Sequence, residues 1–495
     1  MIKKFKKMLS LLSAAAVTAS ACVFTVPANA VTAPLFYSEC EDLELAGDAQ
    51  ITDNVYGGYN TGFSGKGYVW IQGNGSFSFE VDAPEDGMYN LEVRSWQYLD
   101  ETGRVQSYSV NGNKGTSYLM PHSDTFTDYS MGLIRLNKGT NEIKIQSGDN
   151  VGYGYALYDT VTVTKAVMPE LNIKPVLSDP NATKETQGLM NYLCDMYGKH
   201  IISGQQEIYG NGHTVDQPAG YSGDDLLGYE SEFEWINKNF GVYPAIRGFD
   251  MMNYNPLYGW DDGTTERIIE WGNERNGIPT VCWHINVPKN FADYTLGDAV
   301  DWTECTYKPD ETDFDTAQAV IEGTKENEYF KLAIADLAEQ LLRVQEAGVP
   351  IIFRPLHEAE GNSNIDGSGS WFWWGKGGAE VYKQLWQLLY TTLTEEYGVH
   401  NLIWEYNSYD YSTSPSWYPG DEWVDIVGYD KYNCIYNRHD GKPSGSGPNE
   451  DAISSTFYTL VDLTNGKKLV SMPENDTVPS LDNIMVEQAY WLYFC

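Results

Sequence analysis

The chain has 495 residues, more than one ordinary domain requires, so we expect at least two domains. It carries 69 acidic against 32 basic residues, a formal net charge of −37. A field of that sign repels nucleic acid and anionic membranes, so we expect neither as a partner. The aromatic content of 14% favours a neutral carbohydrate ligand, because the apolar faces of sugars lie flat on aromatic rings.

Residues 1–30 have the three parts of a secretory signal: an early lysine cluster, an apolar stretch from Leu9 to Phe24, and the small-residue cleavage site Ala28-Asn29-Ala30. We therefore expect a secreted, extracellular protein. Cys22 raises the alternative of a lipoprotein, but Ala19 stands where a larger aliphatic residue is usual. No later apolar run is long enough to span a bilayer.

The cysteines give no metal motif. Of the 7 cysteines, one lies in the predicted signal, and the others form no CxxC pair that would indicate a zinc site. An extracellular compartment permits disulfides. The sequence does not fix the pairing, and our hypothesis is a bond between Cys282 and Cys305.

Residues 35–165 predict an all-β sandwich of the jelly-roll type. Short β-rich runs such as Tyr89 to Trp96 and Thr160 to Thr164 are separated by Gly, Asn and Asp. No pair of acids here stands beside a His or Arg at a strand end. We interpret this segment as a binding module rather than a catalyst. A proline-bearing linker, residues 166–184, follows it.

From residue 185 to 495, strand-like runs alternate with amphipathic helical stretches, which predicts a (β/α)8 TIM barrel. The eight predicted strands are His200–Ser203, Pro244–Phe249, Pro279–His284, Pro350–Leu356, Leu402–Tyr406, Val424–Tyr429, Lys468–Met472 and Tyr490–Phe494. Such barrels place their function at the carboxyl ends of the strands. Polar or aromatic candidates stand there on most of these strands: Arg247, Asp250, Trp283, His284, Asn286, Glu358, Trp404, Glu405, Asn407, Asp430, Tyr432 and Glu474.

The fourth predicted strand ends in the densest group of such residues. Arg354, His357 and Glu358 follow the apolar run directly, and a polar loop leads to the aromatic run Trp371–Trp374. A carboxyl group beside a His, an Arg and a wall of rings predicts a glycan-cleaving site. The alternatives are an ordinary surface pair and an aromatic run that belongs to the core. A zinc-protease HExxH motif is excluded, because no His follows at the required position.

A glycosidase needs a second carboxyl group on the other side of the scissile bond. Glu474 has the right position, because the strand before it and the strand before Glu358 lie across the barrel mouth from each other. Glu405, on the neighbouring strand, is the runner-up, and Asp430 is a further candidate. Glu360 belongs to the same loop as Glu358, so we expect it to be poorly placed to face that residue.

The region from about residue 180 resembles glycoside hydrolase family 26, whose members are mostly β-mannanases. The matching motifs are Ile202–Gln206, Arg247–Asn253, Trp283–Pro288, Arg354–Glu358 with Trp371–Gly375, Trp404–Asn407 and Tyr418–Asp430. The resemblance implies a retaining enzyme that needs no cofactor, with Glu358 as acid/base and Glu474 as nucleophile. It also implies roles in binding sugar or orienting the carboxylates for His284, His357, Trp371 and Tyr432, and we add Trp283 from the same motif.

The implied substrate is a plant cell-wall β-1,4-mannan, including glucomannan and galactomannan, cleaved internally by a monomeric enzyme. A β-glucanase or xylanase with the same catalytic pair remains an alternative. So does a glycan-binding protein without turnover. The family continues beyond its eighth strand with a Trp-bearing strand end and a closing helix, whereas this sequence ends at Cys495. We therefore expect a barrel without its last helix, exposed apolar surface on strands eight and one, low stability and impaired activity.

The segment 35–165 resembles carbohydrate-binding modules of families 35 and 6. The matching stretches are Ser38–Glu41, Tyr59–Val69, Gly87–Tyr89 and Leu157–Val161. The resemblance implies a structural calcium ion held by Glu39, Glu41 and Asp159, which suits an ion that takes hard oxygen ligands. The alternative is that the two glutamates only solvate an edge strand. Aromatic candidates for sugar contact in this module are Trp96, Tyr153 and Tyr155.

Overall fold

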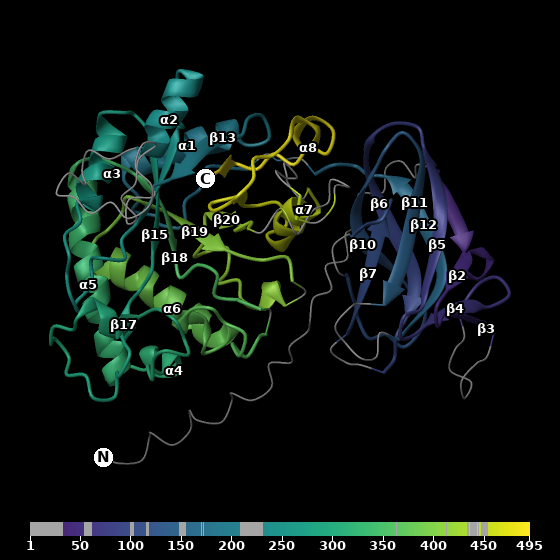
Figure 1. Cartoon of the computed structure of the whole chain (residues 1–495), viewed down its shortest axis with the longest axis horizontal. Helices are drawn as coiled ribbons and strands as arrows, with labels where there is room; N and C mark the ends of the chain where they lie inside the picture. Colours follow the sequence, from purple (N-terminus) through teal and green to yellow (C-terminus); the bar gives the residue numbers. More distant parts are fainter. Residues whose placement is uncertain are drawn as a thin grey trace, which may run out of the picture.

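The computed structural model describes residues 33–53, 62–99, 103–114, 118–147, 155–169, 171, 173–207, 231–362, 364–411, 413–432, 435, 443, 445–446 and 454–495. The predicted signal, Tyr153 and Cys434 lie outside these ranges. Figure 1 shows two bodies, a β-sandwich formed by the first part of the chain and a barrel formed by the rest.

The first body is two antiparallel sheets, as predicted. One sheet has the order β10-β6-β12-β4-β3 with β1 paired to β12, and the other has the order β2-β5-β11-β7-β8 with β9 paired to β7. The strands are β1 (Phe36–Glu39), β2 (Glu44–Ala46), β3 (Gln50–Thr52), β4 (Tyr68–Ile71), β5 (Ser76–Ala83), β6 (Gly87–Trp96), β7 (Arg104–Val110), β8 (Asn113–Lys114), β9 (Tyr118–Met120), β10 (Thr127–Leu136), β11 (Gly139–Ser147) and β12 (Ala156–Lys165).

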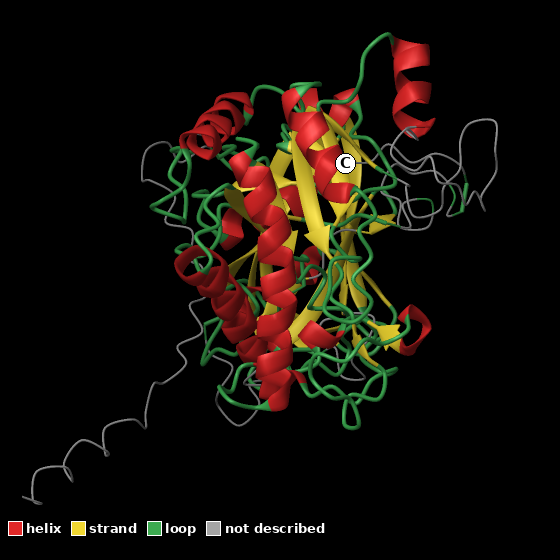
Figure 2. Cartoon of the chain, turned by 90° about the vertical axis from the view of Figure 1, so that its left-hand side faces the viewer, coloured by secondary structure: helices red, strands yellow, loops and turns green. Residues whose placement is uncertain are grey.

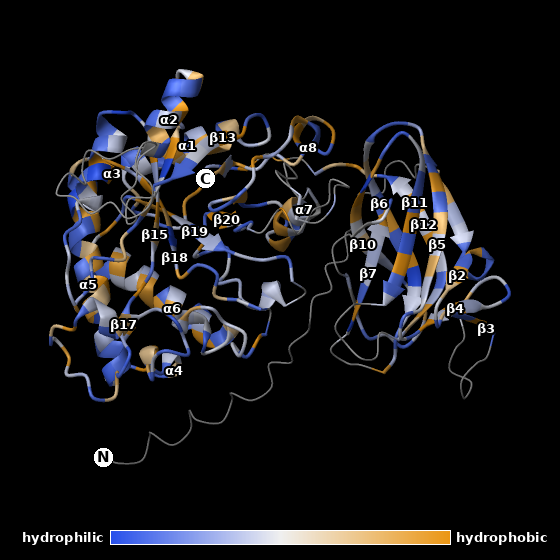
Figure 3. Cartoon of the chain, in the orientation of Figure 1, coloured by the Kyte–Doolittle hydropathy of each residue, from blue (hydrophilic) through white to orange (hydrophobic). Residues whose placement is uncertain are grey.

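Alternation of apolar and polar residues builds the core of this sandwich. On β5, Phe77, Phe79 and Val81 are buried, and Glu80 between them is exposed. Figure 3 shows the resulting mixture of hydrophobic and hydrophilic positions along the strands. The hairpin from β7 to β8 turns through Asn111 and Gly112, both with positive φ, which two-residue hairpin turns require.

The second body is a barrel of eight parallel strands in the order β21-β20-β19-β18-β15-β14-β13-β22, which confirms the predicted fold. They are β13 (Ile202–Gln206), β14 (Ile246–Asp250), β15 (Ile278–Trp283), β18 (Ile351–Pro355), β19 (Leu402–Asn407), β20 (Ile426–Gly428), β21 (Leu469–Ser471) and β22 (Tyr493–Phe494). The ring closes between β21 and β22, where the Met472 amide donates to the Tyr493 carbonyl at 2.9 Å and the Cys495 amide to the Met472 carbonyl at 3.0 Å.

Helices surround this ring of strands (Figure 2). They are α1 (Lys184–Met196), α2 (Ser231–Phe240), α3 (Thr264–Asn273), α4 (Thr316–Ala319), α5 (Lys325–Glu346), α6 (Ala379–Thr391) with a π-helical last turn (Thr392–Glu396), α7 (Ser454–Leu463) and α8 (Leu481–Met485). Helix α5 shows why such a segment is helical. Thr324 caps its first turn, accepting from the Asn327 amide at 3.2 Å, and Gly348 with a φ of 75° follows its end.

The loops at the barrel mouth contain a further short pair of strands, β16 (Val287–Pro288) and β17 (Cys305–Thr306), which run antiparallel. Short helical turns are η1 (Cys40–Asp42), η5 (Trp302–Glu304), η6 (Trp373–Gly375) and η8 (Ser414–Ser416). No helix among the described residues is both long and apolar enough to cross a bilayer.

Two expectations from the sequence are wrong. The side chains of Leu492 and Tyr493 are fully buried and Ile202 is 6% exposed, so strands eight and one do not present the expected apolar surface. They share the barrel core with residues of α1 and α7. Cys282 and Cys305 are both free thiols. Cys282 lies near Arg354 and Asp430 of the barrel interior, whereas the Cys305 thiol donates to the Asp301 carbonyl at 3.4 Å.

The sandwich contacts the barrel through β10. Arg135 forms an ion pair with Asp482 at 3.1 Å and approaches Glu487 at 3.7 Å. Leu133 of the same strand packs against the apolar core of the barrel. One side of the sandwich therefore rests on the α7–α8 region.

Candidate active site

The backbone after β18 turns sharply to present Glu358. Leu356 and Glu358 both have positive φ, at 50° and 52°, a region that residues other than glycine rarely adopt. The Glu358 amide donates to Asn407 Oδ1 at 2.7 Å, and the Tyr409 hydroxyl donates to Glu358 Oε1 at 2.8 Å. Asn407 ends β19 and Tyr409 follows it by two residues, so the neighbouring strand and its loop hold Glu358 in place.

The surroundings of Glu358 favour its protonated form. Burial raises the pKa of this carboxyl, and the nearby charge of Glu474 raises it further. The hydrogen bond from Tyr409 and the charge of Arg354 oppose these effects without reversing them. Glu358 therefore has the character of an acid that keeps its proton above the ordinary pH range of a glutamate.

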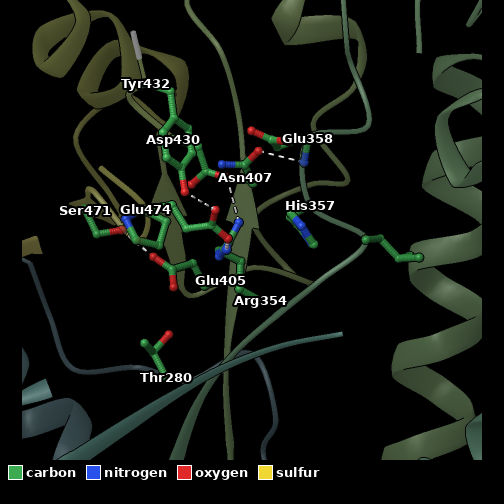
Figure 4. A network of polar contacts seen from close by, with 12 residues as sticks. Thr280, Arg354, His357, Glu358, Glu405, Asn407, Asp430, Tyr432, Ser471 and Glu474 are labelled. Carbon is green, nitrogen blue, oxygen red and sulfur yellow. Dashed lines mark hydrogen bonds and ion pairs between the residues drawn. The ribbon is translucent and has the colours of Figure 1, made fainter. Parts of the chain in front are cut away.

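Glu474, which follows β21, sits in a contrasting environment. Its Oε1 accepts from Arg354 Nη2, and its Oε2 accepts from the Tyr432 hydroxyl at 2.7 Å. Arg354 also donates to Asp430 Oδ2 at 2.7 Å (Figure 4). Burial lowers the pKa of the Arg354 guanidinium, but Asp430 and Glu474 together raise it well above its usual value. A permanent cation and a hydroxyl donor thus bind both oxygens of Glu474, which is the setting of an ionised carboxylate.

Two histidines line the site beside these groups. His284 Nδ1 lies 2.6 Å from Asp250 Oδ2, and His284 Nε2 lies 3.2 Å from His357 Nε2. His357 is 1% exposed, and burial together with the charge of Arg354 lowers its pKa well below the usual value, so it is neutral. His284 is the more exposed of the two, and its side chain is 21% accessible.

The aromatic run after the polar loop divides into an exposed ring and buried rings. Trp371 is 37% exposed and packs edge-on against Tyr409 with ring centroids 5.9 Å apart. Trp373 and Trp374 are fully buried, and Trp374 Nε1 donates to the His357 carbonyl at 2.7 Å. Of the predicted indole rings, only Trp371 is accessible to a ligand among the described residues of this run. The buried Trp374 instead fixes the backbone next to Glu358.

The prediction that Trp283 and Trp96 contact sugar is wrong, because both side chains are buried. Trp283 is 1% exposed and belongs to the barrel core, because alternate residues of β15 face opposite sides and its neighbour His284 faces the site. Trp96 is 2% exposed, packs with Tyr68 and Phe126, and donates from Nε1 to the Ser123 carbonyl at 2.7 Å. Neither ring offers a face to a ligand.

The alternative second carboxyl groups are enclosed. Glu405 is fully buried and accepts from Ser471 and from Tyr493, the latter at 2.5 Å. Asp430 is 4% exposed and Glu360 is 1% exposed. Tyr409, which binds Glu358, was missed from the sequence, although it stands two residues after the predicted strand-end residue Asn407.

The predicted calcium ligands surround one turn of the sandwich. Glu39 Oε2 accepts from Ser64 Oγ at 2.6 Å, Asp159 Oδ1 from the Ser64 amide at 2.8 Å, and Glu41 Oε1 from the Lys66 amide at 2.7 Å. Glu41 Oε2 is buried and has no hydrogen-bond partner in the described part of the chain. Carboxylate oxygens around one turn fit calcium in kind, although Arg94 at 3.1 Å already binds Asp159 Oδ2.

A closed parallel barrel that carries two carboxyl groups after β18 and β21, together with an exposed indole in a mouth loop, is the arrangement of a glycoside hydrolase. The family model for glycosyl hydrolase family 26 matches residues 178–495. The chain belongs to that family.

Relatives and solved structures extend the similarity over nearly the whole chain. A mannan endo-1,4-beta-mannosidase of Thermothelomyces thermophilus is 32% identical over 92% of this chain and 83% of its own length. Mannan endo-1,4-beta-mannosidase B of Piromyces sp is 31% identical over 96% and 73%. The crystal structure of a ruminal GH26 endo-beta-1,4-mannanase superposes with a TM-score of 0.79 at 51% identity, covering 94% of this chain and 92% of that one. The crystal structure of a Podospora anserina GH26-CBM35 beta-(1,4)-mannanase superposes with a TM-score of 0.54 at 30% sequence identity. The match covers 93% of this chain and 90% of that one.

Proposed function

We propose that the protein is an endo-acting hydrolase that cleaves the β-1,4-linked backbone of mannan, glucomannan and galactomannan with retention of anomeric configuration. The observation that carries the proposal is the opposite treatment of two carboxyl groups. Burial raises the pKa of Glu358, whereas Glu474 is bound by Arg354 and Tyr432. Two acids held in opposite protonation states are what a retaining mechanism requires. Mannan is chosen because the similar proteins are mannanases by name.

The mechanism follows from these roles. Protonated Glu358 gives its proton to the leaving glycosidic oxygen, while ionised Glu474 attacks the anomeric carbon to form a glycosyl-enzyme. Glu358, now a base, takes a proton from water while the water oxygen attacks the anomeric carbon. The bond between that carbon and Glu474 breaks, and the sugar leaves. Retention requires the two carboxyl groups to stand roughly 5–5.5 Å apart. Arg354 and Tyr432 hold Glu474 oriented for attack.

Several polar atoms beside this site are enclosed by protein. His357 Nδ1, Asn407 Nδ2 and Asp430 Oδ1 have no hydrogen-bond partner among the described residues. Trp371 supplies the apolar platform for a sugar ring, and His284 and Tyr432, at 21% side-chain and 47% residue exposure, line the approach.

We also propose that the sandwich is a carbohydrate-binding module stabilised by calcium at Glu39, Glu41 and Asp159, and that the protein is secreted as a monomer. A polymer-binding module would keep a diffusing enzyme on its insoluble substrate by raising its effective concentration there.

The decisive experiment is the release of reducing sugar from mannan, β-glucan and xylan, with proton NMR of the first product to read its anomeric configuration. The proposal expects turnover of mannan with retention. Preferred hydrolysis of glucan or xylan would replace the substrate but keep the catalytic pair. Binding without turnover of any of the three would show a glycan-binding protein.

A further inference from the structure

A second group of chemically active side chains lies beside the catalytic pair. Asp250 ends β14 and is the register partner of Cys282 on β15, and His284 follows Cys282 by two residues. The carboxylate oxygen, the thiol sulfur and an imidazole nitrogen of these residues all lie within 4.8 Å of one another. The proposed catalytic steps use neither Cys282 nor Asp250 as a reacting group.

We propose that Asp250, Cys282 and His284 form an inhibitory site for a thiophilic divalent cation, of which Zn²⁺ is the type. One sulfur, one imidazole nitrogen and one carboxylate oxygen are ligands that zinc takes at about 2.0–2.3 Å, with a fourth tetrahedral position left for water. A thiol ligand selects against Mg²⁺ and Ca²⁺, which prefer oxygen. The side chains of Asp250 and His284 are 31% and 21% exposed, which gives an ion a path to the buried Cys282.

Occupation of this site would disturb the sugar-binding wall. The ion replaces the hydrogen bond of 2.6 Å between His284 Nδ1 and Asp250 Oδ2. The thiol proton leaves to solvent, and the neutral imidazole binds through Nδ1 with its one ring proton on Nε2. His284 then reorients, and its contact of 3.2 Å with His357, the residue before Glu358, changes. Bound metal and bound glycan therefore compete for the same imidazole.

The test titrates the full chain with Co²⁺, a spectroscopic substitute for Zn²⁺, and with Zn²⁺ in a calorimeter. We expect one equivalent to bind, a thiolate-to-cobalt absorption band to appear, and a chelator to reverse both. Cys282→Ala should remove the band and weaken binding by at least the roughly 10–100-fold that loss of an outer-shell partner costs. The matched control is Cys305→Ser, which also alters a free thiol but lies outside the cluster.

Inhibition is the second readout. Zn²⁺ should raise KM for the glycan in the parent and in Cys305→Ser, and should have little effect on Cys282→Ala. No cobalt band in the parent, or a band that survives Cys282→Ala, would overturn the proposal. The band is read without glycan, so it remains decisive even if the proposed hydrolase activity fails.

A different observation concerns the buried carboxylate of Glu360, which collects four hydrogen bonds. Its Oε1 accepts from the Tyr406 hydroxyl at 3.2 Å, from Ser408 Oγ at 3.3 Å and from the Tyr409 amide at 3.1 Å. Its Oε2 accepts from Ser414 Oγ at 2.5 Å. Every donor belongs to β19 or the loop after it. Glu360 thus fixes the backbone of the tyrosine whose hydroxyl binds Glu358.

We infer, resting on the proposed function, that Glu360 is a positioning residue that acts on Glu358 through Tyr409. Glu360→Gln replaces one acceptor oxygen with a donor, so the loop must shift. A shift of about 1 Å at a reacting group can lower kcat roughly 100-fold. Because the Tyr409 hydrogen bond lowers the pKa of Glu358, its loss should move the alkaline limb of kcat/KM to higher pH.

The test compares Glu360→Gln, Tyr409→Phe and the double variant. Both single variants should move the limb upward, and the double variant should move it no further than Tyr409→Phe does. A lower melting temperature with an unmoved limb, or additive shifts, would leave Glu360 a purely structural residue. An inactive parent would defeat both the function and this role, whereas an active parent with normal variants would defeat the role alone.

Discussion

Arg354 contacts Glu474 across 120 residues of sequence, and the same guanidinium binds Asp430. This contact separates the two carboxyl groups of the site chemically. Glu474 is paired with a permanent cation. Glu358 instead accepts a hydrogen bond from the neutral Tyr409 hydroxyl, and its burial raises its pKa. The different roles of Glu358 and Glu474 therefore depend on the ion pair that Arg354 forms with Glu474 alone of the two.

The first prediction separates the two carboxyl groups by their leaving-group dependence. Glu474→Ala should abolish hydrolysis of every substrate, because no nucleophile remains. Glu358→Ala should lower turnover of mannan by roughly 10²–10⁴-fold, the usual contribution of a general acid. It should spare the first step on aryl glycosides whose leaving group needs no proton. Mannan hydrolysis that survives Glu474→Ala would exclude Glu474 as the nucleophile.

A second prediction concerns the pH dependence of activity. Acid catalysis needs protonated Glu358, so activity is present below its pKa and is lost as pH rises through it. Burial and the charge of Glu474 raise this pKa above 4.5. The alkaline limb of the profile of kcat/KM against pH should therefore also lie above 4.5. In Glu474→Gln the repulsion disappears, so the Glu358 carboxyl, followed by carbon-13 NMR, should titrate at lower pH than in the parent. An unchanged titration would mean that the two groups do not interact.

A third prediction uses Asp462 on α7, whose pKa burial raises to about 7. A carboxyl with a raised folded-state pKa contributes stability below its unfolded pKa, and the contribution is lost as pH rises through the folded value. Asp462→Asn should therefore leave the free energy of unfolding unchanged near pH 4. It should raise the free energy of unfolding at pH 8 by on the order of 4 kcal/mol, because each pKa unit of the shift is worth about 1.4 kcal/mol. Urea unfolding at both values checks this, and a benefit of equal size at the two would refute it.

The calcium proposal makes a fourth prediction. Removing calcium from the full chain with a chelator should lower the melting temperature, and added calcium should restore it. Glu41→Gln should abolish this response, whereas Glu44→Gln, at an exposed position of the neighbouring strand, should keep it. Calorimetry of parent and variants provides the measurement. A chelator without effect on the parent would remove calcium from the module.

The sequence was informative where one-dimensional order decides the outcome. Apolar runs followed by polar residues located the barrel strands, and the geometry of a closed ring led from Glu358 to Glu474 on the strand across the mouth. Orientation was harder to predict. A barrel strand is buried on both faces, so composition alone does not say whether Trp283 or His284 faces the site. Glu360 was set aside because it cannot face Glu358, whereas the structure connects the two through Tyr409.

The two left-handed residues after β18 bear on attempts to make the protein more heat-resistant. Each non-glycine residue in that conformation costs on the order of 1–3 kcal/mol, and the surrounding packing has to compensate. Replacing Leu356 by glycine would remove the backbone strain at that position. It would also make the turn that orients the Glu358 side chain more flexible. Substitutions that raise thermal stability at this turn should therefore lower kcat. Stabilising substitutions are better placed at sites remote from it.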